Sequence, residues 1–218
     1  MQHSVEATVE ADGLIRKNHF LIRKLHSLTG LIPIGAFFMF HIYENANIFN
    51  GSKAWNEGTG WILKMPVIWF FEIFFIALPI LFHGIFGIWI VWTGQPNLEM
   101  YDTRRNYMYY VQRITGVLVF VFIIIHVFMT RLYGIYADVH IDARYMIAHF
   151  DNLLILIFYI VGILSGAYHF SNGLWNMAIT WGITIGRHSQ RIWEIMCWLI
   201  GTAFAALGIA VAIVFYLK

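Results

Sequence analysis

Four histidines lie inside long apolar stretches of this 218-residue chain, at matching places in successive stretches: His41, His83, His126 and His169. An imidazole ring in hydrocarbon needs a polar partner, and ionisable residues inside a membrane are candidates for function. Imidazole nitrogens also bind haem iron and other transition metals. A single such histidine is better explained by a hydrogen bond to a neighbouring helix. Four at matching positions favour a redox or metal site.

The elements that must carry these histidines are membrane-spanning helices. Hydrophobic residues make up 60% of the chain and charged residues 12%, a balance typical of membrane proteins. About 20 helical residues cross a ~30 Å hydrocarbon layer, and five apolar runs are that long: 28–48, 66–92, 108–133, 152–175 and 192–217. We therefore predict an all-α membrane protein with five transmembrane helices. The net charge of +2 gives no sign of a nucleic-acid partner.

The first two predicted helices resemble the next two. His41 and His83 are 42 residues apart, and His126 and His169 are 43 apart. A Thr-Gly pair, at 29–30 and at 115–116, precedes the first histidine of each set. The second histidine of each set begins the pattern His-x-x-x-Gly-x-Trp, in HGIFGIW and HFSNGLW. This spacing indicates duplication of a helix pair.

The basic residues predict the orientation of the chain, because Lys and Arg gather on the cytoplasmic side of a membrane. With a cytoplasmic N-terminus, nine of the 14 basic residues flank the helices on the inner side and five on the outer side. The C-terminus is then outside. In this interpretation residues 1–20 form a cytoplasmic surface segment, and residues 21–218 form a single transmembrane domain.

This topology places the histidines at two depths. His41 and His126 come late in outward-running helices and share the outer half of the membrane, while the other two come late in inward-running helices and share the inner half. Two facing histidines at each depth are what bis-histidine haem requires. We therefore predict that helices one to four surround two stacked haems b and that helix five is peripheral. Glycines near the histidines (84, 87, 166 and 173) fit close approach of the macrocycle or, equally, close helix packing.

At this level of detail the sequence resembles the di-haem cytochrome b subunits of succinate:quinone oxidoreductases, the succinate dehydrogenases and fumarate reductases with one large membrane anchor. The strings LHSLTG and QRITG and the four histidines carry the resemblance, which extends through helix five. It implies that His41 and His126 bind the iron of a distal haem. It likewise implies that His83 and His169 bind the iron of a proximal haem, near an iron–sulfur subunit, in a bacterial cytoplasmic (inner) membrane.

The resemblance also implies partners that this chain does not encode. These are the iron–sulfur subunit, a flavoprotein subunit with FAD and the dicarboxylate site, and menaquinone or menaquinol as the substrate in the lipid; the whole complex is a candidate dimer. The single cysteine, Cys197, excludes a four-cysteine cluster made by this chain alone. Members that move protons along helix four carry Glu two residues before the proximal-haem histidine. Ala167 stands there, so the resemblance does not extend to that proton path.

Polar residues at the inner side are candidates for binding haem propionates, which are anionic and attract Arg, Lys and hydroxyl groups. They are His26, Ser27, Arg23 and Arg113, and the family uses the pair that matches His26 and Ser27. For the arginines, membrane topology alone is an equally good explanation.

Quinone chemistry needs an acid or a base near the distal haem. Glu72 lies about three turns before His83, and Glu44 lies about one turn beyond His41, so both fall near the outer level. The alternatives are a helix-to-helix hydrogen bond for Glu72 and a solvated cap for Glu44. Further polar residues at that end are Arg131, Asp151 and Lys64.

Two other functions use the same features. A proton- or metal-coupled transporter also has internal repeats and polar residues at mid-membrane, although few carboxylates accompany these histidines. A haem-free structural anchor for a soluble enzyme is the third alternative. A reduced-minus-oxidised spectrum with two haems b distinguishes electron transfer from both.

Overall fold

The computed structural model describes residues 18–95 and 97–218, so nearly all of the predicted surface segment lies outside the described residues. Within them, five helices are long and apolar enough to cross a membrane, which confirms that prediction. They span Asn18–Asn50, Ile68–Thr93, Arg104–Tyr136, Leu153–Thr180 and Arg187–Leu217. Each extends beyond its apolar run at one end or both, by a single residue in the second span, because backbone hydrogen bonding continues into polar turns.

The first three spans each contain a wider π-helical turn. The first consists, from Gly30 on, of η1 (Gly30–Gly35), α2 (Ala36–Asn45) and a 3-10 segment, η2 (Ala46–Asn50). The second consists of α4 (Ile68–Phe71), η3 (Glu72–Ala77) and α5 (Leu78–Thr93), and the third of α6 (Arg104–Val127), η4 (Phe128–Leu132) and α7 (Tyr133–Tyr136). The last two spans are α9 (Leu153–Thr180) and α10 (Arg187–Leu217). Such turns often mark functional sites, and these hold Pro33, Glu72 and Arg131.

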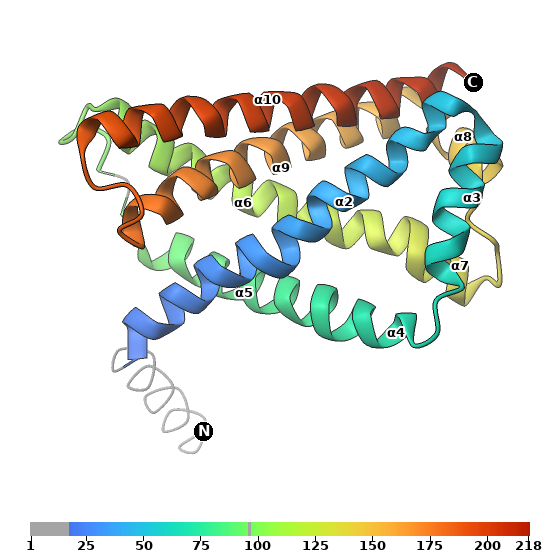
Figure 1. The fold of residues 1–218 in the computed structure, drawn as a ribbon, viewed down its shortest axis with the longest axis horizontal. Coiled ribbons are helices and arrows are strands. Elements are labelled where there is room, and N and C mark those ends of the chain that lie inside the picture. Colours follow the sequence, from blue (N-terminus) through green and yellow to red (C-terminus); the bar gives the residue numbers. More distant parts are fainter. Residues whose placement is uncertain (1–17, 96) are drawn as a thin grey trace.

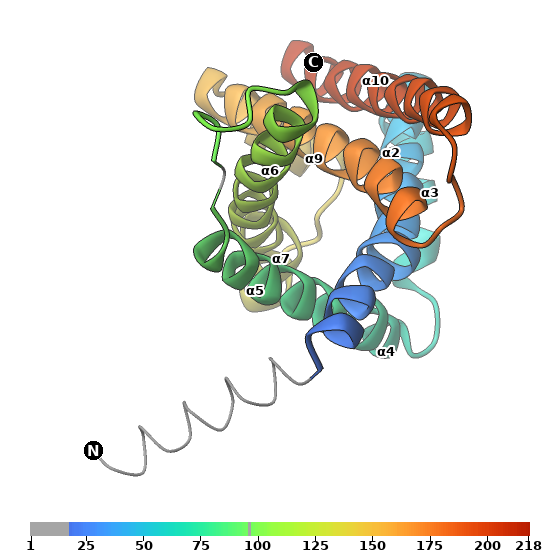
Figure 2. The same ribbon diagram turned by 90° about the vertical axis from the view of Figure 1, so that its left-hand side faces the viewer.

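The first four spans form a bundle with α10 on its outside. Figure 2 shows α2, α5, α6 and α9 arranged in a ring. Within that ring α6 packs against both α5 and α9, and η1 of the first span contacts the same two helices. The span that contains α2 therefore lies diagonally opposite α6. As predicted for helix five, α10 packs on the outer side of α9 and against α2 (Figure 1).

Two short helices, α3 (Ser52–Leu63) and α8 (Ala143–Phe150), lie at the end of the bundle that holds the C-terminus (Figure 1). The Asp142 side chain caps α8 by accepting a hydrogen bond from the Tyr145 N–H at 2.9 Å. A buried apolar cluster that includes Ile48, Trp55 and Phe150 ties this end together. Many large apolar side chains face outward elsewhere, as a surface in contact with lipid requires.

Candidate functional site

The four intramembrane histidines meet as two pairs inside the bundle. The ring centres of His41 and His126 are 5.8 Å apart with an interplanar angle of 71°, and we call them the α2–α6 pair. The ring centres of His83 and His169 are 6.0 Å apart at 86°, and we call them the α5–α9 pair. Each pair joins helices from opposite sides of the ring in Figure 2.

The two pairs lie at different levels of the bundle. In the first span, Gly30 sits against the ring of His83, whereas His41 follows about three turns later. In the third span, Gly116 sits against the ring of His169, and His126 again follows about three turns later. At 1.5 Å per residue, the levels are about 15 Å apart along each helix.

The Nδ1 atom of each histidine in the α5–α9 pair faces a backbone carbonyl of a neighbouring helix. His83 Nδ1 lies 2.8 Å from the oxygen of His26, and His169 Nδ1 lies 3.1 Å from the oxygen of Gln112. A carbonyl only accepts, so both Nδ1 atoms carry the hydrogen and both Nε2 atoms keep a free lone pair. This is the tautomer that a metal-binding histidine needs, fixed by a neighbouring acceptor.

The Thr-Gly repeat explains how these carbonyls come within reach. The hydroxyls of Thr29 and Thr115 donate to the oxygens of His26 and Gln112, at 3.0 and 3.2 Å. A Cβ on Gly116 would lie 2.8 Å from His169 Cε1, and one on Gly30 would collide with the ring of His83. The glycine therefore lets each imidazole lie directly on the opposing backbone. The duplicated Thr-Gly motif therefore forms the same histidine-binding surface in both halves of the repeat.

The glycines near the histidines, which the sequence offered for macrocycle approach or for helix packing, have different surroundings. A Cβ on Gly84 would collide with the Phe120 ring of α6, so Gly84 serves close packing of helices. Gly166 and Gly173 have neighbours only at 3.4 Å or beyond, which is ordinary contact distance. A Cβ on Gly87 would have ordinary contact with His26 Nε2 at 3.4 Å, whereas the glycines that a Cβ would press hardest against an imidazole are Gly30 and Gly116 of the Thr-Gly motifs.

The α2–α6 pair has side-chain neighbours in place of carbonyls. His126 Nδ1 lies 3.0 Å from the phenol oxygen of Tyr159 on α9, and that oxygen lies 3.4 Å from His149 Nε2 on α8. His41 stacks with Phe37, with ring centres 5.4 Å apart. Asn45 donates to the backbone oxygen of His41 at 2.8 Å, and its amide nitrogen lies 3.5 Å from His41 Nε2.

Polar atoms without a protein partner lie beside the α5–α9 pair. The His26 ring stacks on His83, with centres 4.0 Å apart and planes 9° from parallel. Among the described residues, His26 Nε2 and Arg113 Nε are buried and have no hydrogen-bond partner. The Arg113 guanidinium lies over the Tyr109 ring, 3.9 Å from its centre. Ser27 is half-buried beside His26, and Arg23 is exposed.

Glu72 and Arg131 form an ion pair between the second and third spans. Arg131 Nε donates to one carboxylate oxygen at 2.7 Å, and its Nη2 donates to the other at 3.0 Å. Both side chains are partly exposed, at 29% for Glu72 and 40% for Arg131. The helix-to-helix contact considered for Glu72 is therefore present, as a charged, bidentate hydrogen-bonded pair. Lys64 and Asp151 are exposed and are not part of this pair.

Glu44 is not a solvated cap, and that alternative was wrong. The residue is 9% exposed, and its Oε2 accepts from the Asn47 side chain at 3.3 Å. The carboxylate also lies against Gly58 of α3, where a Cβ would be 2.8 Å away. The fold of α3 back over the end of α2 is what buries it.

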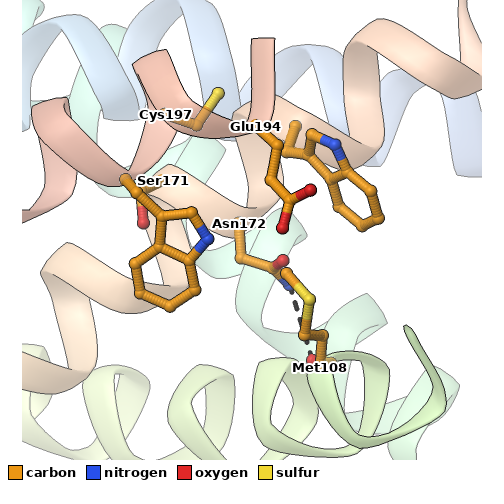
Figure 3. Close-up of a pocket in the computed structure, with 7 residues that line it drawn as sticks. Met108, Ser171, Asn172, Glu194 and Cys197 are labelled. Carbon is orange, nitrogen blue, oxygen red and sulfur yellow. Dashed lines mark hydrogen bonds between the residues drawn. The ribbon is translucent and has the colours of Figure 1, made fainter. Parts of the chain in front are cut away.

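A second polar cluster, which the sequence analysis did not identify, lies where α6, α9 and α10 meet. Glu194 of α10 is 8% exposed, pairs with Arg104, and lies 3.6 Å from Arg191 Nη1. Figure 3 shows its carboxylate directed toward Asn172, beside a cavity of about 10 Å³. Asn172 donates to the Gln112 side chain at 2.8 Å. Through Asn172, this cluster therefore adjoins Gln112, whose backbone oxygen faces His169 Nδ1.

Comparison with known proteins was consistent with this architecture. Residues 93–210 match the family model for the succinate dehydrogenase/fumarate reductase transmembrane subunit. The chain belongs to this family. A similar protein is the succinate dehydrogenase cytochrome b558 subunit of Bacillus subtilis (strain 168), which is 38% identical over 191 residues, covering 87% of this chain and 94% of that protein. As a family member, the chain is a membrane subunit of the succinate dehydrogenase or fumarate reductase type.

Several residues around the histidines escaped the sequence analysis. Gln112 and Tyr159 contact ligand candidates from other helices. Gln112 begins the QRITG string, which was noted only for its resemblance, and the sequence neighbours of Tyr159 give no sign of its role. Glu194 did carry a signal, because a carboxylate just inside an apolar run is costly unless it is paired. Among the described residues, no three His, Cys, Asp or Glu side chains gather into a metal-binding group, and bis-histidine ligation uses only two.

Proposed function

We propose that this subunit is a di-haem cytochrome b that passes electrons between a membrane quinone and a partner iron–sulfur subunit. The observation that carries the proposal is the arrangement of the four histidines as two facing pairs at two levels. The succinate dehydrogenase cytochrome b558 subunit of Bacillus subtilis bears a name that fits it. The α5–α9 pair is assigned to a proximal haem and the α2–α6 pair to a distal haem.

The spacing of each pair fits one iron between two imidazoles. Two nitrogen–metal bonds of about 2 Å, with about 1 Å from each nitrogen to its ring centre, put the two centres about 6 Å apart. The observed separations are 5.8 and 6.0 Å. A haem held by the two histidines of a pair would supply one-electron transfer, because ligation by two protein groups would leave no open site for substrate.

The orphaned polar atoms fit the propionates of the proximal haem. A buried polar atom without a partner costs about 1–3 kcal/mol. His26 Nε2 and Arg113 Nε are two such atoms; the His26 ring lies on His83, and Arg113 lies three residues before Gly116 on α6. A propionate carboxylate that reaches either atom would satisfy it. Ser27 and Arg23 remain candidates at the same end.

The orientation follows from the distribution of charge. Arg104, Arg191 and Arg113 all lie at the end of the bundle that holds the α5–α9 pair, which favours this end as the cytoplasmic one. The iron–sulfur and flavoprotein subunits then bind there, and the N-terminus is cytoplasmic with the C-terminus outside. The membrane is the bacterial cytoplasmic membrane.

Quinone chemistry is assigned to the opposite end, at the level of the α2–α6 pair. The Glu72–Arg131 pair is a charged acid–base group within the membrane span, partly open to the lipid, and both residues sit in π-helical turns. A quinone oxygen needs a donor, and quinol oxidation needs an acceptor of protons. Glu72 is therefore the first candidate and the buried Glu44 the second, with menaquinone as the expected quinone.

The deciding experiment is a reduced-minus-oxidised spectrum of the complex purified from its native membrane, with haem measured per chain. We expect two haems b with separable midpoint potentials. A colourless preparation that still binds its soluble partner subunits would establish the haem-free anchor. A colourless preparation that moves protons or metal ions across vesicles would establish the transporter.

A further inference from the structure

The phenol of Tyr159 stands between two histidines from different elements. Its oxygen lies 3.0 Å from His126 Nδ1 on α6 and 3.4 Å from His149 Nε2 on α8. Tyr159 itself is on α9 and is 6% exposed. The phenol ring meets both imidazole rings nearly edge-on, with ring centres 5.5 and 5.8 Å apart. Three helices thus converge on one hydroxyl group.

The hydroxyl has a single hydrogen, so only certain arrangements satisfy both neighbours. If His126 Nδ1 carries a hydrogen and donates it to the phenol oxygen, the phenol hydrogen is free to reach His149 Nε2. His126 Nε2 then keeps its lone pair and is able to bind a metal. If the phenol donated to His126 Nδ1 instead, the hydrogen of the imidazole would sit on Nε2 and block ligation.

The state of His149 favours the first arrangement. His149 lies on α8, outside the membrane spans, and is half-buried. Burial lowers the pKa of His149, because a charged ring loses hydration there. A neutral ring that carries its hydrogen on Nδ1 accepts a hydrogen bond through Nε2, whereas a charged ring accepts at neither nitrogen. An acceptor at this position directs the phenol hydrogen away from His126.

Packing holds the three rings in these positions. Phe122 lies nearly parallel to His126 at 5.5 Å between ring centres, and its ring is edge-on to Tyr159. Phe150 packs on the other side of Tyr159, with ring centres 4.5 Å apart. Tyr145 lies parallel to His149 at 6.1 Å. None of these neighbours offers a second polar group to His126 Nδ1.

We propose that Tyr159 is the positioning residue of His126, accepting its Nδ1 hydrogen, and that His149 sets the direction of the phenol. The proposal rests on the proposed function, in which His126 is a haem ligand. It also gives the two levels of the bundle different support. Backbone carbonyls serve both histidines of the α5–α9 pair, whereas His126 depends on a side chain that a substitution can remove.

The expected consequence is electronic as well as geometric. An imidazole that donates a hydrogen bond through Nδ1 is a more basic ligand, and such outer partners typically change metal affinity or activity by about 10–100-fold. A more basic ligand stabilises the oxidised iron. Loss of the phenol oxygen should therefore favour reduction of the haem bound by the α2–α6 pair, by about threefold to tenfold. For a one-electron couple, tenfold corresponds to about 59 mV.

The test compares Tyr159→Phe with Tyr168→Phe in the purified complex, using redox titration in which the two haems are resolved. Tyr168 is the matched control, because it is on the same helix and its hydroxyl donates to the Met108 backbone oxygen at 3.2 Å and not to an imidazole. The component that His126→Ala removes identifies the distal haem. We expect Tyr159→Phe to raise the midpoint of that component alone, and Tyr168→Phe to move neither.

Equal shifts of both haems, or no shift in Tyr159→Phe, would overturn the proposal. If Tyr159→Phe does not assemble, His149→Leu decides. It leaves the phenol in place but removes its acceptor, so a shifted distal midpoint supports the proposal and an unshifted one overturns it. Absence of haem from the wild-type complex would instead overturn the proposed function, so the two failures are distinguishable.

Discussion

Gly116 offers a direct test of how the repeat seats its histidines. In Gly116→Ala, the new Cβ would lie 2.8 Å from His169 Cε1 and 3.1 Å from its Nδ1. Real side chains do not approach so closely, so the imidazole must move. The ring cannot move freely, since Nδ1 is bonded to the Gln112 carbonyl at 3.1 Å. The variant should therefore weaken the α5–α9 pair as a ligand set.

The size of the effect follows from three contributions. Overpacking of a tight site costs about 1–3 kcal/mol, and loss of the Nδ1 hydrogen bond costs about 0.5–1.5 kcal/mol. Alanine is better than glycine within a helix by about 1 kcal/mol. The net cost is about 2 kcal/mol, which corresponds to a roughly 30-fold lower affinity for the proximal haem.

The assay is the haem content of each component in the purified complex, measured while haem is withdrawn by an excess of a haem-binding apoprotein. Gly173→Ala is the control, because a Cβ there has ordinary contact, 3.5 Å from Gln112 Nε2. We expect faster loss of the proximal haem in Gly116→Ala and unchanged loss of the distal haem. Equal retention of the proximal haem in Gly116→Ala and Gly173→Ala would refute the seating argument.

Three further predictions concern the ligands, the quinone end and the inner polar cluster. Replacing either histidine of the α5–α9 pair with Ala should remove the same haem and leave the other spectrally intact, and the α2–α6 pair should behave likewise for the second haem. Loss of one haem by replacing a histidine from each pair would contradict the assignment. Glu72→Gln keeps the size of the side chain but weakens its bond to Arg131. It should slow quinol-linked turnover, while haem content and dicarboxylate turnover with artificial dyes stay unchanged. Unaltered quinol turnover would place the quinone pocket elsewhere. Arg104→Ala removes one cation from the buried Glu194 and leaves the more distant Arg191 as its partner among the described residues. Since Arg104 is itself 59% exposed, we expect a loss of only about 1 kcal/mol of unfolding free energy in detergent. Lys53→Ala, whose ion pair is at the surface, is the control, and equal thermal midpoints of the two variants would count against a stabilising role of the cluster.

Much of the architecture could be predicted from the sequence. Five spans follow from the length of the apolar runs, because a helix is the simplest way to satisfy backbone hydrogen bonds in lipid. The two levels of histidine follow from the rise per residue and the alternating direction of the spans. The spacing of the repeat also indicated that the first two spans resemble the next two. These features are local or periodic, and a sequence records such features directly.

The support around the histidines was decided by the tertiary structure. Gln112 reaches His169 from another helix, and Tyr159 reaches His126 only because α6, α8 and α9 converge. Arg131 was named as a polar neighbour, but its two-pronged bond to Glu72 depends on how the second and third spans pack. Glu44 is buried because α3 folds back over it, although its position near a helix end suggested solvent. Spacing along one helix fixes which residues share a face, whereas contacts between helices depend on tilt and packing, which periodicity does not specify.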